Sequence, residues 1–283
     1  ANSGITYEGK YFKQTADIDL NNETNWTPIG KSNNPFKGIF NGDGHQITNL
    51  EVTGNSNNAG LFGYVDGAII QNCNVTGEVN GYDYVGGVVG NAYGKTQILS
   101  CSFRGDVTGE DSYIGGIAGS ARGTIKNCYA LANVTATATG VNAGGIAGYA
   151  YGVTIENCYY SGEVSAKNYA GGIAGTAWRG TIQNCVSLAE SVTGSNTNRI
   201  VGNIYNLTLT NNYAWSDPAL SADDDAGLNG ANFTYTNGTL SKQFSEIFKN
   251  DSAWKFTDNG LPILKNTGGT QSAYLPPYLT GEG

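Results

Sequence analysis

The stretch GGIAGTAWRGTIQNCVS at residues 171–187 decides the fold, because both of its halves recur along the chain. Copies of the first half are GLFG at 60–63, GGVVG at 86–90, and GGIAG at 115–119, 144–148 and 171–175. Copies of the second half are QITNL at 46–50, IIQNC at 69–73, QILSC at 97–101, TIKNC at 124–128, TIENC at 154–158, TIQNC at 181–185 and TLTNN at 208–212. The pattern therefore predicts an internal repeat with a period of about 28 residues.

This repeat is typical of strands rather than helices. Each unit consists of short β-branched runs between Gly and Asn, and no apolar stripe follows the 3.6-residue period of a helix. A coil of this length can supply three short strands, each paired with its equivalent one turn away at about 4.8 Å. One turn cannot bury its own apolar face, so successive turns must stack into a continuous core. We predict an all-β, right-handed parallel β-helix of about seven turns with a C-terminal cap.

The Asn and Cys of the second half are predicted to form two ladders. Ile125 and Cys128 are three residues apart, so both can face inward only if the chain bends at Asn127, a residue type that tolerates left-handed backbone. The stacked asparagines are Asn72, Asn127, Asn157 and Asn184, extended by Asn49 and Asn211, and each is expected to bond the next turn. The stacked cysteines are Cys73, Cys101, Cys128, Cys158 and Cys185, with Leu50 and Asn212 at the two ends of the stack. We expect five buried free thiols, because in-register Cβ atoms lie nearly 5 Å apart and a disulfide needs roughly 3.8 Å.

Composition narrows the function classes. The net charge of −8 argues against nucleic acid, because phosphate binding requires Lys and Arg. No apolar run approaches the ~18 residues that a membrane span needs, so we predict no membrane insertion by this chain. The cysteines have no accompanying Cys or His partner of metal-site spacing, and we predict no metal and no cofactor. Because the chain lacks an initiator Met and a signal peptide, we expect it to be part of a larger polypeptide.

The glycine-rich copies resemble the GLUG motif of bacterial surface and secreted proteins, which include adhesins of gut Bacteroidetes and the stalks of some large proteases. The segments KYFKQTADIDL at 10–20 and PFKGIFNGDGHQITNL at 35–50 resemble the start of such arrays, and WKFTDNGLPIL at 254–264 resembles their end. The resemblance covers residues 4–265 or so. It implies a parallel β-helix in a secreted or cell-surface setting, and it implies no single biochemical activity.

One surface row is a candidate ligand-binding site. The row consists of Tyr93, Arg122, Tyr151 and Trp178, with Asp66 in the equivalent position of the first copy. In register, these side chains would stack along one outer corner, where aromatic rings and a guanidinium attract each other. An exposed row of this kind can bind the apolar faces of sugars. The alternative is that the side chains only cover each other and stiffen the turn, which is also our interpretation of the Tyr84, Tyr113 and Tyr169 row and of the Tyr129, Tyr159 and Tyr213 row.

The sequence favours a catalytic site or a calcium site less than it favours the surface row. The only histidine, His45, lies two residues from Asp43 in a turn motif. Alternating Asp17, Asp19, Asn21 and Glu23 echo a calcium loop without its Gly and final Glu, and a second acidic run is Asp223, Asp224 and Asp225. A glycosidase needs two converging carboxylates, whereas Glu78, Asp106 and Glu163 occupy one row of the repeat. We therefore predict that the chain is not an enzyme.

The chain divides into three parts by pattern. Residues 1–216 are predicted to form the solenoid, residues 217–265 an insertion and a C-terminal cap packed on it, and residues 266–283 a tail or linker. Within the second part, SKQFSEIFKN at 241–250 has the apolar spacing of a short amphipathic helix that could fold over the last turn.

Three functions remain open from sequence. The first is a secreted or cell-surface adhesion module whose partner is a glycan or a host surface protein. The second is a structural stalk of a larger surface protein, with no ligand. The third and least favoured is a carbohydrate-active β-helix enzyme, because fold alone does not establish function.

Overall fold

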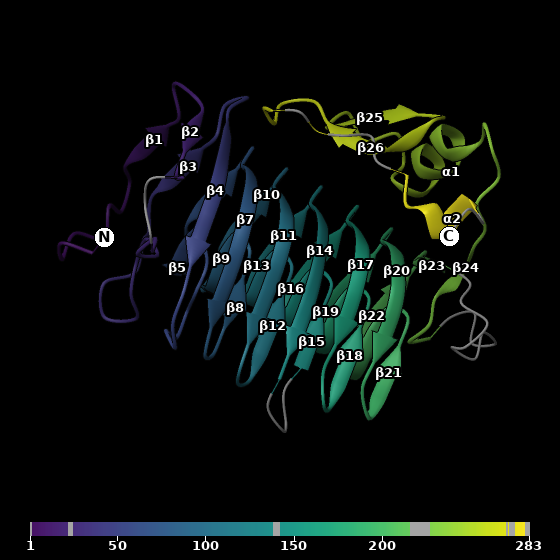
Figure 1. Ribbon diagram of the computed structural model, residues 1–283, viewed down its shortest axis with the longest axis horizontal. Coiled ribbons are helices and arrows are strands. Elements are labelled where there is room, and N and C mark those ends of the chain that lie inside the picture. The colour runs from purple at the N-terminus through teal and green to yellow at the C-terminus, as the bar shows by residue number, and fades with distance from the viewer. Residues whose placement is uncertain are drawn as a thin grey trace.

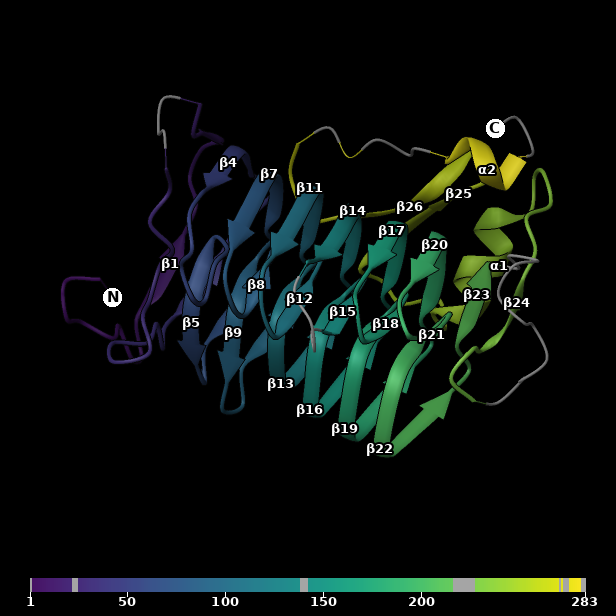
Figure 2. The same ribbon diagram turned by 60° about the horizontal axis from the view of Figure 1, so that its bottom comes forward.

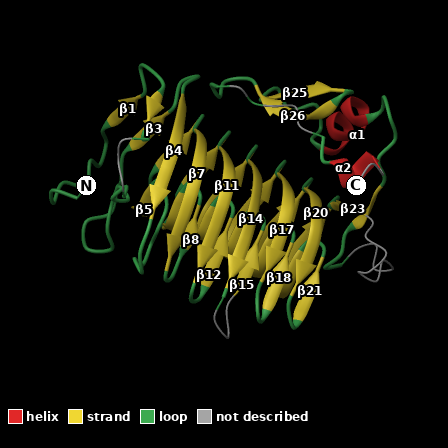
Figure 3. Ribbon diagram, viewed as in Figure 1, coloured by secondary structure: helices red, strands yellow, loops and turns green. Residues whose placement is uncertain are grey.

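Short parallel strands stacked in register form most of the chain (Figures 1 and 3). The computed structural model describes residues 2–21, 25–137, 142–215, 227–269, 271 and 275–280. Two parallel sheets run the length of the stack and a third spans β8 to β21, and the two short helices of the described residues both lie in the C-terminal part of the chain. The predicted all-β parallel solenoid is confirmed.

Each sheet collects one strand, or one part of a long strand, from successive turns. The first sheet contains β1 (Tyr11–Lys13), β3 (Ile39–Asn41), β5 (Phe62–Asp66), β6 (Ile69–Gln71), β9 (Val89–Tyr93), β10 (Gln97–Leu99), β13 (Ala118–Lys126), β16 (Ala147–Glu156), β19 (Ala174–Gln183) and β22 (Val201–Thr210). The second contains β2 (Ile18–Asp19), β4 (Gln46–Val52), β7 (Asn74–Gly81), β11 (Ser102–Gly109), β14 (Tyr129–Ala136), β17 (Tyr159–Ser165), β20 (Val186–Thr193), β23 (Tyr213–Trp215) and β24 (Ala231–Phe233). The third contains β8 (Val85–Gly86), β12 (Tyr113–Gly115), β15 (Asn142–Gly144), β18 (Tyr169–Gly171) and β21 (Asn196–Asn198).

Identical residues stack inside the solenoid. In the first sheet Ile98 pairs with Ile70 and Ile125, and the series continues through later turns. The inward isoleucines of these turns are Ile70, Ile98, Ile125, Ile155 and Ile182, each at most 1% exposed. Full burial of one such side chain contributes about 1.5–3 kcal/mol, so the repeated apolar positions account for the stacking of turns.

The corner between the first and second sheets has the predicted left-handed backbone. Positive φ values of 51° to 55° occur in every copy of the second half from the second copy to the last. The residues at these corners are Asn72, Ser100, Asn127, Asn157, Asn184 and Asn211. An Asn side chain can adopt this conformation at low cost, which explains why five of the six positions carry it.

The five cysteines form one buried column directly after this corner. All are free thiols. The backbone N–H of Cys101 donates to Sγ of Cys128 at 3.4 Å, and that of Cys128 donates to Sγ of Cys158 at the same distance. Asn212 occupies the next position and accepts from the N–H of Cys185 at 3.1 Å. The thiols thus serve as small core groups that also accept hydrogen bonds from the backbone.

Burial should make these thiols unreactive. It raises the pKa of Cys73, Cys128 and Cys185 and so suppresses the reactive thiolate. We expect native protein at pH 8 to release less than one equivalent of thionitrobenzoate from Ellman's reagent within an hour, and unfolded protein in guanidinium chloride to release five. Rapid release of one or more equivalents by the native protein would contradict the buried column.

The prediction of a corner is wrong for QITNL at 46–50, the first copy of the second half. Gln46 and Ile47 pair with Asn74 and Val75, so QITNL continues into the second sheet and does not form the corner. The corner of that turn instead begins at Gly42, whose N–H donates to the carbonyl of Gln71 as that of Asn72 does to Leu99, and Oδ1 of the preceding Asn41 accepts from Asn72 at 2.9 Å. Asn49 and Leu50 therefore belong to neither ladder, and the φ of 57° at Asn49 lies at a register shift between Ile47 and Leu50 within β4.

The asparagine ladder is also interrupted in the middle. Asn211 donates to Oδ1 of Asn184 at 2.7 Å, as predicted for neighbouring turns. Asn127 and Asn157, however, donate to the two carboxylate oxygens of Asp251 at 3.3 and 3.2 Å. A segment of the C-terminal part reaches these corners, and its carboxylate accepts from two turns at once, so the predicted bond between Asn127 and Asn157 is absent.

The C-terminal part both extends the solenoid and runs back along it. β24 pairs with β23, and the carbonyl of Leu228 accepts from the N–H groups of Ile200 and Val201, so residues 227–233 cover the last turn. Beyond them come α1 (Leu240–Ile247), the antiparallel pair β25 (Trp254–Thr257) and β26 (Gly260–Leu264), and α2 (Pro277–Thr280). These elements lie along the side of the stacked strands in Figures 1 and 2. The helix is confirmed, but it covers the side of the solenoid and not its end.

An apolar strip on the outer face of the second sheet explains this position. Tyr129, Tyr159, Val186 and Leu188 point away from the solenoid core and are covered by α1, β25 and β26. Trp254 lies at the centre of this second core, 1% exposed, with its ring 5.7 Å from that of Tyr159. The row of Tyr129 and Tyr159 is therefore a docking surface for the chain's own C-terminal part.

The expected tail or linker at 266–283 is wrong for the residues that are described there. Thr267 donates to the carbonyl of Ser100, and the carbonyl of Gly268 accepts from Asn74. Leu279 is 3% exposed, and the hydroxyl of Tyr278 lies 2.9 Å from that of Ser161. The sequence suggested a linker because GG and PP pairs carry no periodic pattern, yet these contacts hold the segment against the second sheet.

Candidate functional site

The predicted surface row lies on the first sheet. Asp66 pairs with Tyr93, and Tyr151 pairs with Trp178, so these positions stack on neighbouring strands. Arg122 lies at a bulge, because the register shifts between Ala121 and Gly123. The extra residue is on β16, where Tyr151 and Gly152 lie opposite the single Arg122 of β13.

The row continues one turn further than the sequence suggested. Tyr205 on β22 pairs with Trp178, and the two rings are 5.4 Å apart. Its side chain is 59% exposed, compared with 42% for both Tyr93 and Trp178. The degraded repeat VGNI at 201–204 directly precedes Tyr205 and could have located it. We call Tyr93, Arg122, Tyr151, Trp178 and Tyr205 the aromatic–arginine row.

Two guanidinium groups are integrated into this row. The Cζ of Arg122 is 4.4 Å from the ring centroid of Tyr93 and 4.8 Å from that of Tyr151. Arg179 lies beside Tyr151 as well, at 6.0 Å from Cζ to the ring centroid, and donates to its hydroxyl at 3.5 Å. Cation–π contacts at these distances favour a fixed orientation of both guanidinium groups.

A second group of tyrosines adjoins the row on the first and third sheets. The Tyr64 ring is 6.2 Å from Tyr93, and the Tyr149 ring is 6.3 Å from Tyr151. Tyr113 stacks on Tyr149 at 4.6 Å with an interplanar angle of 22°. Burial raises the pKa of both rings of this stack, so their hydroxyls remain protonated hydrogen-bond donors at neutral pH.

The row predicted from Tyr84, Tyr113 and Tyr169 is therefore partly merged with this surface. Tyr84 lies 5.5 Å from Tyr113, ring to ring. The two rows meet because the tight glycine corner in each turn folds the third sheet back against the first. At Gly115 an added Cβ would lie 2.1 Å from the carbonyl oxygen of Ala118, so the approach needs a residue without a side chain. Sequence spacing alone could not show that two separate rows meet.

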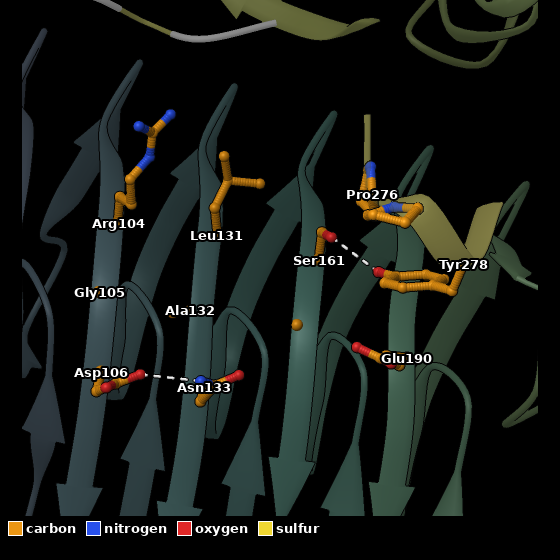
Figure 4. Close-up of a pocket in the computed structure, with 12 residues that line it drawn as sticks. Arg104, Gly105, Asp106, Leu131, Ala132, Asn133, Ser161, Glu190, Pro276 and Tyr278 are labelled. Carbon is orange, nitrogen blue, oxygen red and sulfur yellow. Dashed lines mark hydrogen bonds between the residues drawn. The ribbon is translucent and has the colours of Figure 1, made fainter. Parts of the chain in front are cut away.

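A groove on the opposite side of the solenoid was not predicted (Figure 4). It has a volume of about 640 Å³ and lies over the outer face of the second sheet. Its walls include Arg104, Asp106, Asn133, Ser161, Glu190 and the C-terminal Pro276, Pro277 and Tyr278. Because one wall comes from the presumed linker, no periodic signal in the sequence pointed to this groove.

The groove does not bring two carboxylates together in the manner of a glycosidase. Asp106 is on β11 and Glu190 is on β20, and β14 and β17 lie between them. Three strand spacings separate their backbones by about 14 Å, beyond the roughly 5–10 Å between the two carboxyl groups of these enzymes. Asp106 accepts a hydrogen bond from Asn133 at 3.0 Å, and Glu78 stacks beside it in register. The acidic row is thus spread along the solenoid axis, as the sequence indicated.

His45 contacts a different carboxylate from the expected one. Asp43 forms an ion pair with Lys13 at 2.6 Å, whereas Nδ1 of His45 lies 3.2 Å from Asp17. The backbone N–H of Gln46, and then His45, lower the pKa of Asp17. Asp17 is exposed and His45 is half-buried, and both lie beside the first strands, away from the aromatic–arginine row.

The described residues contain no cluster of three or more His, Cys, Asp or Glu side chains that could hold a metal ion. Asp19 instead accepts from the side chain of Asn49 and from the backbone of Asn21. Glu23 and the run Asp223, Asp224 and Asp225 lie outside the residues that the structure describes. In the same described part of the chain, no helix has the length and apolar character that crossing a membrane requires.

Comparisons with known proteins agree with the repeat. The family model of the GLUG motif matches residues 81–108 and 110–135, so the chain carries GLUG motifs. A "Putative Gly-rich membrane protein" of Evansella cellulosilytica is 36% identical over 98 residues, which are 31% of this chain and 11% of that protein. The chain thus spans a small part of this relative. The crystal structure of a "putative immunoglobulin A1 protease" from Bacteroides ovatus matches with a TM-score of 0.73 and 26% identity, over 93% of this chain and 87% of that one.

Proposed function

We propose that this chain is a cell-surface or secreted adhesion module that binds glycans through the aromatic–arginine row. The observation that carries the proposal is the exposure of Tyr93, Trp178 and Tyr205 in one stacked line, at 42%, 42% and 59%. Exposed aromatic side chains that gather in one line are typical of an interaction surface, whereas scattered ones are ordinary.

Sugars suit this surface for a chemical reason. One face of a pyranose ring presents several C–H groups, and these pack against aromatic rings, while the hydroxyls need hydrogen-bond partners. The row offers rings on successive turns about 4.8 Å apart, so a linear oligosaccharide could contact several of them. The phenol hydroxyls of Tyr149 and Tyr151 and the guanidinium groups supply polar partners beside the rings.

The structural stalk and the enzyme have less support than the glycan-binding module. A stalk with no ligand does not require Trp178 and Tyr205 to be exposed together at its surface. The likeness to the Bacteroides ovatus protein raises proteolysis as a possibility for this fold. Against it, all five thiols are buried and, of the acidic groups that the structure describes, His45 contacts only Asp17, so we propose that the chain itself is not catalytic.

The test is a glycan-array screen followed by calorimetric titration of the best oligosaccharide. We expect the parent to bind and a Tyr93→Ala/Tyr151→Ala/Trp178→Ala variant to lose at least about tenfold in affinity, since each ring contributes of order 0.5–1.5 kcal/mol. The matched control is Tyr11→Ala/Tyr82→Ala, which removes two rings, 55% and 40% exposed, that lie outside the row. Circular dichroism verifies that all three proteins are folded.

The outcomes separate the hypotheses. If the triple variant and the control lose affinity for the oligosaccharide equally, the aromatic–arginine row is not the binding site. Absence of binding by the parent to every glycan would overturn glycan binding and favour the structural stalk.

A further inference from the structure

We infer that the row recognises acidic glycans, with Arg122 and Arg179 as the subsite for an anionic group on the sugar. This inference rests on the proposed glycan binding and specifies its ligand class. It is carried by two guanidinium groups, of the half-buried Arg122 and the exposed Arg179, that contact aromatic rings and have no carboxylate partner among the described residues. The shared ligand chemistry is a carboxylate or a sulfate on a pyranose ring.

Neither arginine of this surface forms an ion pair, a property that they share with Arg104 and Arg199 among the described residues. Among the described residues, ion pairs join Lys13 to Asp43, Lys37 to Asp66, and Lys126 to both Glu156 and Asp251. No such pair within 4.0 Å involves Arg122 or Arg179 in that part of the chain. In a chain of net charge −8, acidic partners are abundant, yet the row holds two cations that lack one.

The geometry leaves the guanidinium edges available. The Tyr93 and Tyr151 ring centroids lie 4.4 and 4.8 Å from Cζ of Arg122, and among the described residues no hydrogen bond occupies its N–H groups. A planar fork of this kind binds a carboxylate or a sulfate through two parallel hydrogen bonds. Because the rings already restrict the side chain, binding loses less conformational entropy than it would at a free arginine.

The surrounding charges favour an anion at this location. Asp66 is the acidic side chain at the head of the row, and Lys37 neutralises it at 3.3 Å. Arg122 on β13 and Arg179 on β19 are separated by one strand, β16, so their backbones are about 10 Å apart. A linear oligosaccharide that lies along the row could therefore place acidic groups at both arginines while its rings contact Tyr151 and Trp178.

The experiment compares three probes of equal length by calorimetric titration. They are an oligogalacturonide, its carboxyl-reduced neutral counterpart, and a sulfated neutral oligosaccharide. We expect the parent to bind at least one acidic probe about tenfold to a hundredfold more tightly than the neutral one, as charge-assisted hydrogen bonds provide. Which acidic probe binds distinguishes a carboxylate from a sulfate ligand.

The variants test the arginines directly. Arg122→Gln/Arg179→Gln should lower affinity for the acidic probe at least about tenfold, well beyond its effect on the neutral probe, and so remove the preference. Arg122→Lys/Arg179→Lys, which keeps the charge but not the planar fork, should recover only part of it. Arg104→Gln is the matched control, since Arg104 is exposed on the second sheet.

Failure of the inference is distinct from failure of the proposed function. Equal binding of neutral and acidic probes by the parent, unchanged in the glutamine variant, would overturn the inference and leave glycan binding intact. An acidic preference that is retained in the glutamine variant would equally overturn it. Lack of binding to all probes and to the array would overturn both.

Discussion

Replacement of Gly144 by Ala should destabilise the chain by at least about 4 kcal/mol or prevent folding, a loss seen only when a substitution breaks a specific structural requirement. A Cβ added at Gly144 would lie 2.1 Å from the carbonyl oxygen of Ala147 and 2.7 Å from Cα of Ala174. Both atoms are backbone of neighbouring segments, so neither can move without separating the turns. The measurement is the urea midpoint followed by circular dichroism.

Gly152→Ala is the control for this prediction. Gly152 has a φ of 58°, yet an added Cβ there meets no atom within 4 Å. The expected loss is only the roughly 1–2 kcal/mol of a left-handed non-glycine residue. Similar midpoints for the two variants would show that close approach of the turns at GGIAG does not determine the fold.

Trp254→Ala should destabilise the C-terminal part by about 3–5 kcal/mol, the usual range for removal of a buried tryptophan. Its ring packs within 5.7 Å of Tyr159 and 5.1 Å of Phe248, and its Nε1 donates to Asn127 at 3.1 Å. Because this second core is separate from the solenoid core, we expect a first unfolding step at lower urea that exposes the Tyr129 and Tyr159 strip to a hydrophobic dye.

The matched control is Trp178→Ala, the same substitution at a side chain that is 42% exposed. It should change stability by no more than about 1 kcal/mol, since surface substitutions rarely do more. If Trp254→Ala unfolds like the parent, the C-terminal part does not pack on the second sheet as described.

The repeating part of the fold was predictable because each position has one dominant physical requirement. Ile125 and its equivalents must be apolar, Asn127 must tolerate a left-handed backbone, and Cys128 must be small and buried. Each of these residue types recurs in successive turns, and this recurrence makes the pattern detectable in the sequence. The first turn was misread because QITNL satisfies the apolar part of the pattern, whereas the true corner begins at Gly42, where later turns have Asn or Ser.

Contacts between distant segments could not be predicted in the same way. The link from Asp251 to Asn127 and Asn157 joins residues that are 124 and 94 positions apart, and no periodic pattern marks it. The groove beside Tyr278 depends on the same return of the chain along the solenoid. For the candidate site, repeat spacing located Tyr93, Arg122, Tyr151 and Trp178, while Arg179 was missed because it lies beside the repeated position.

The measurement that tests the central claim most directly is a crystal structure of the chain with the oligosaccharide that binds most tightly. The account predicts a sugar ring stacked on Tyr151 or Trp178, with an acidic group in hydrogen-bond contact with Arg122 or Arg179. A sugar bound instead in the groove between Asp106 and Tyr278, with the aromatic–arginine row unoccupied, would contradict it.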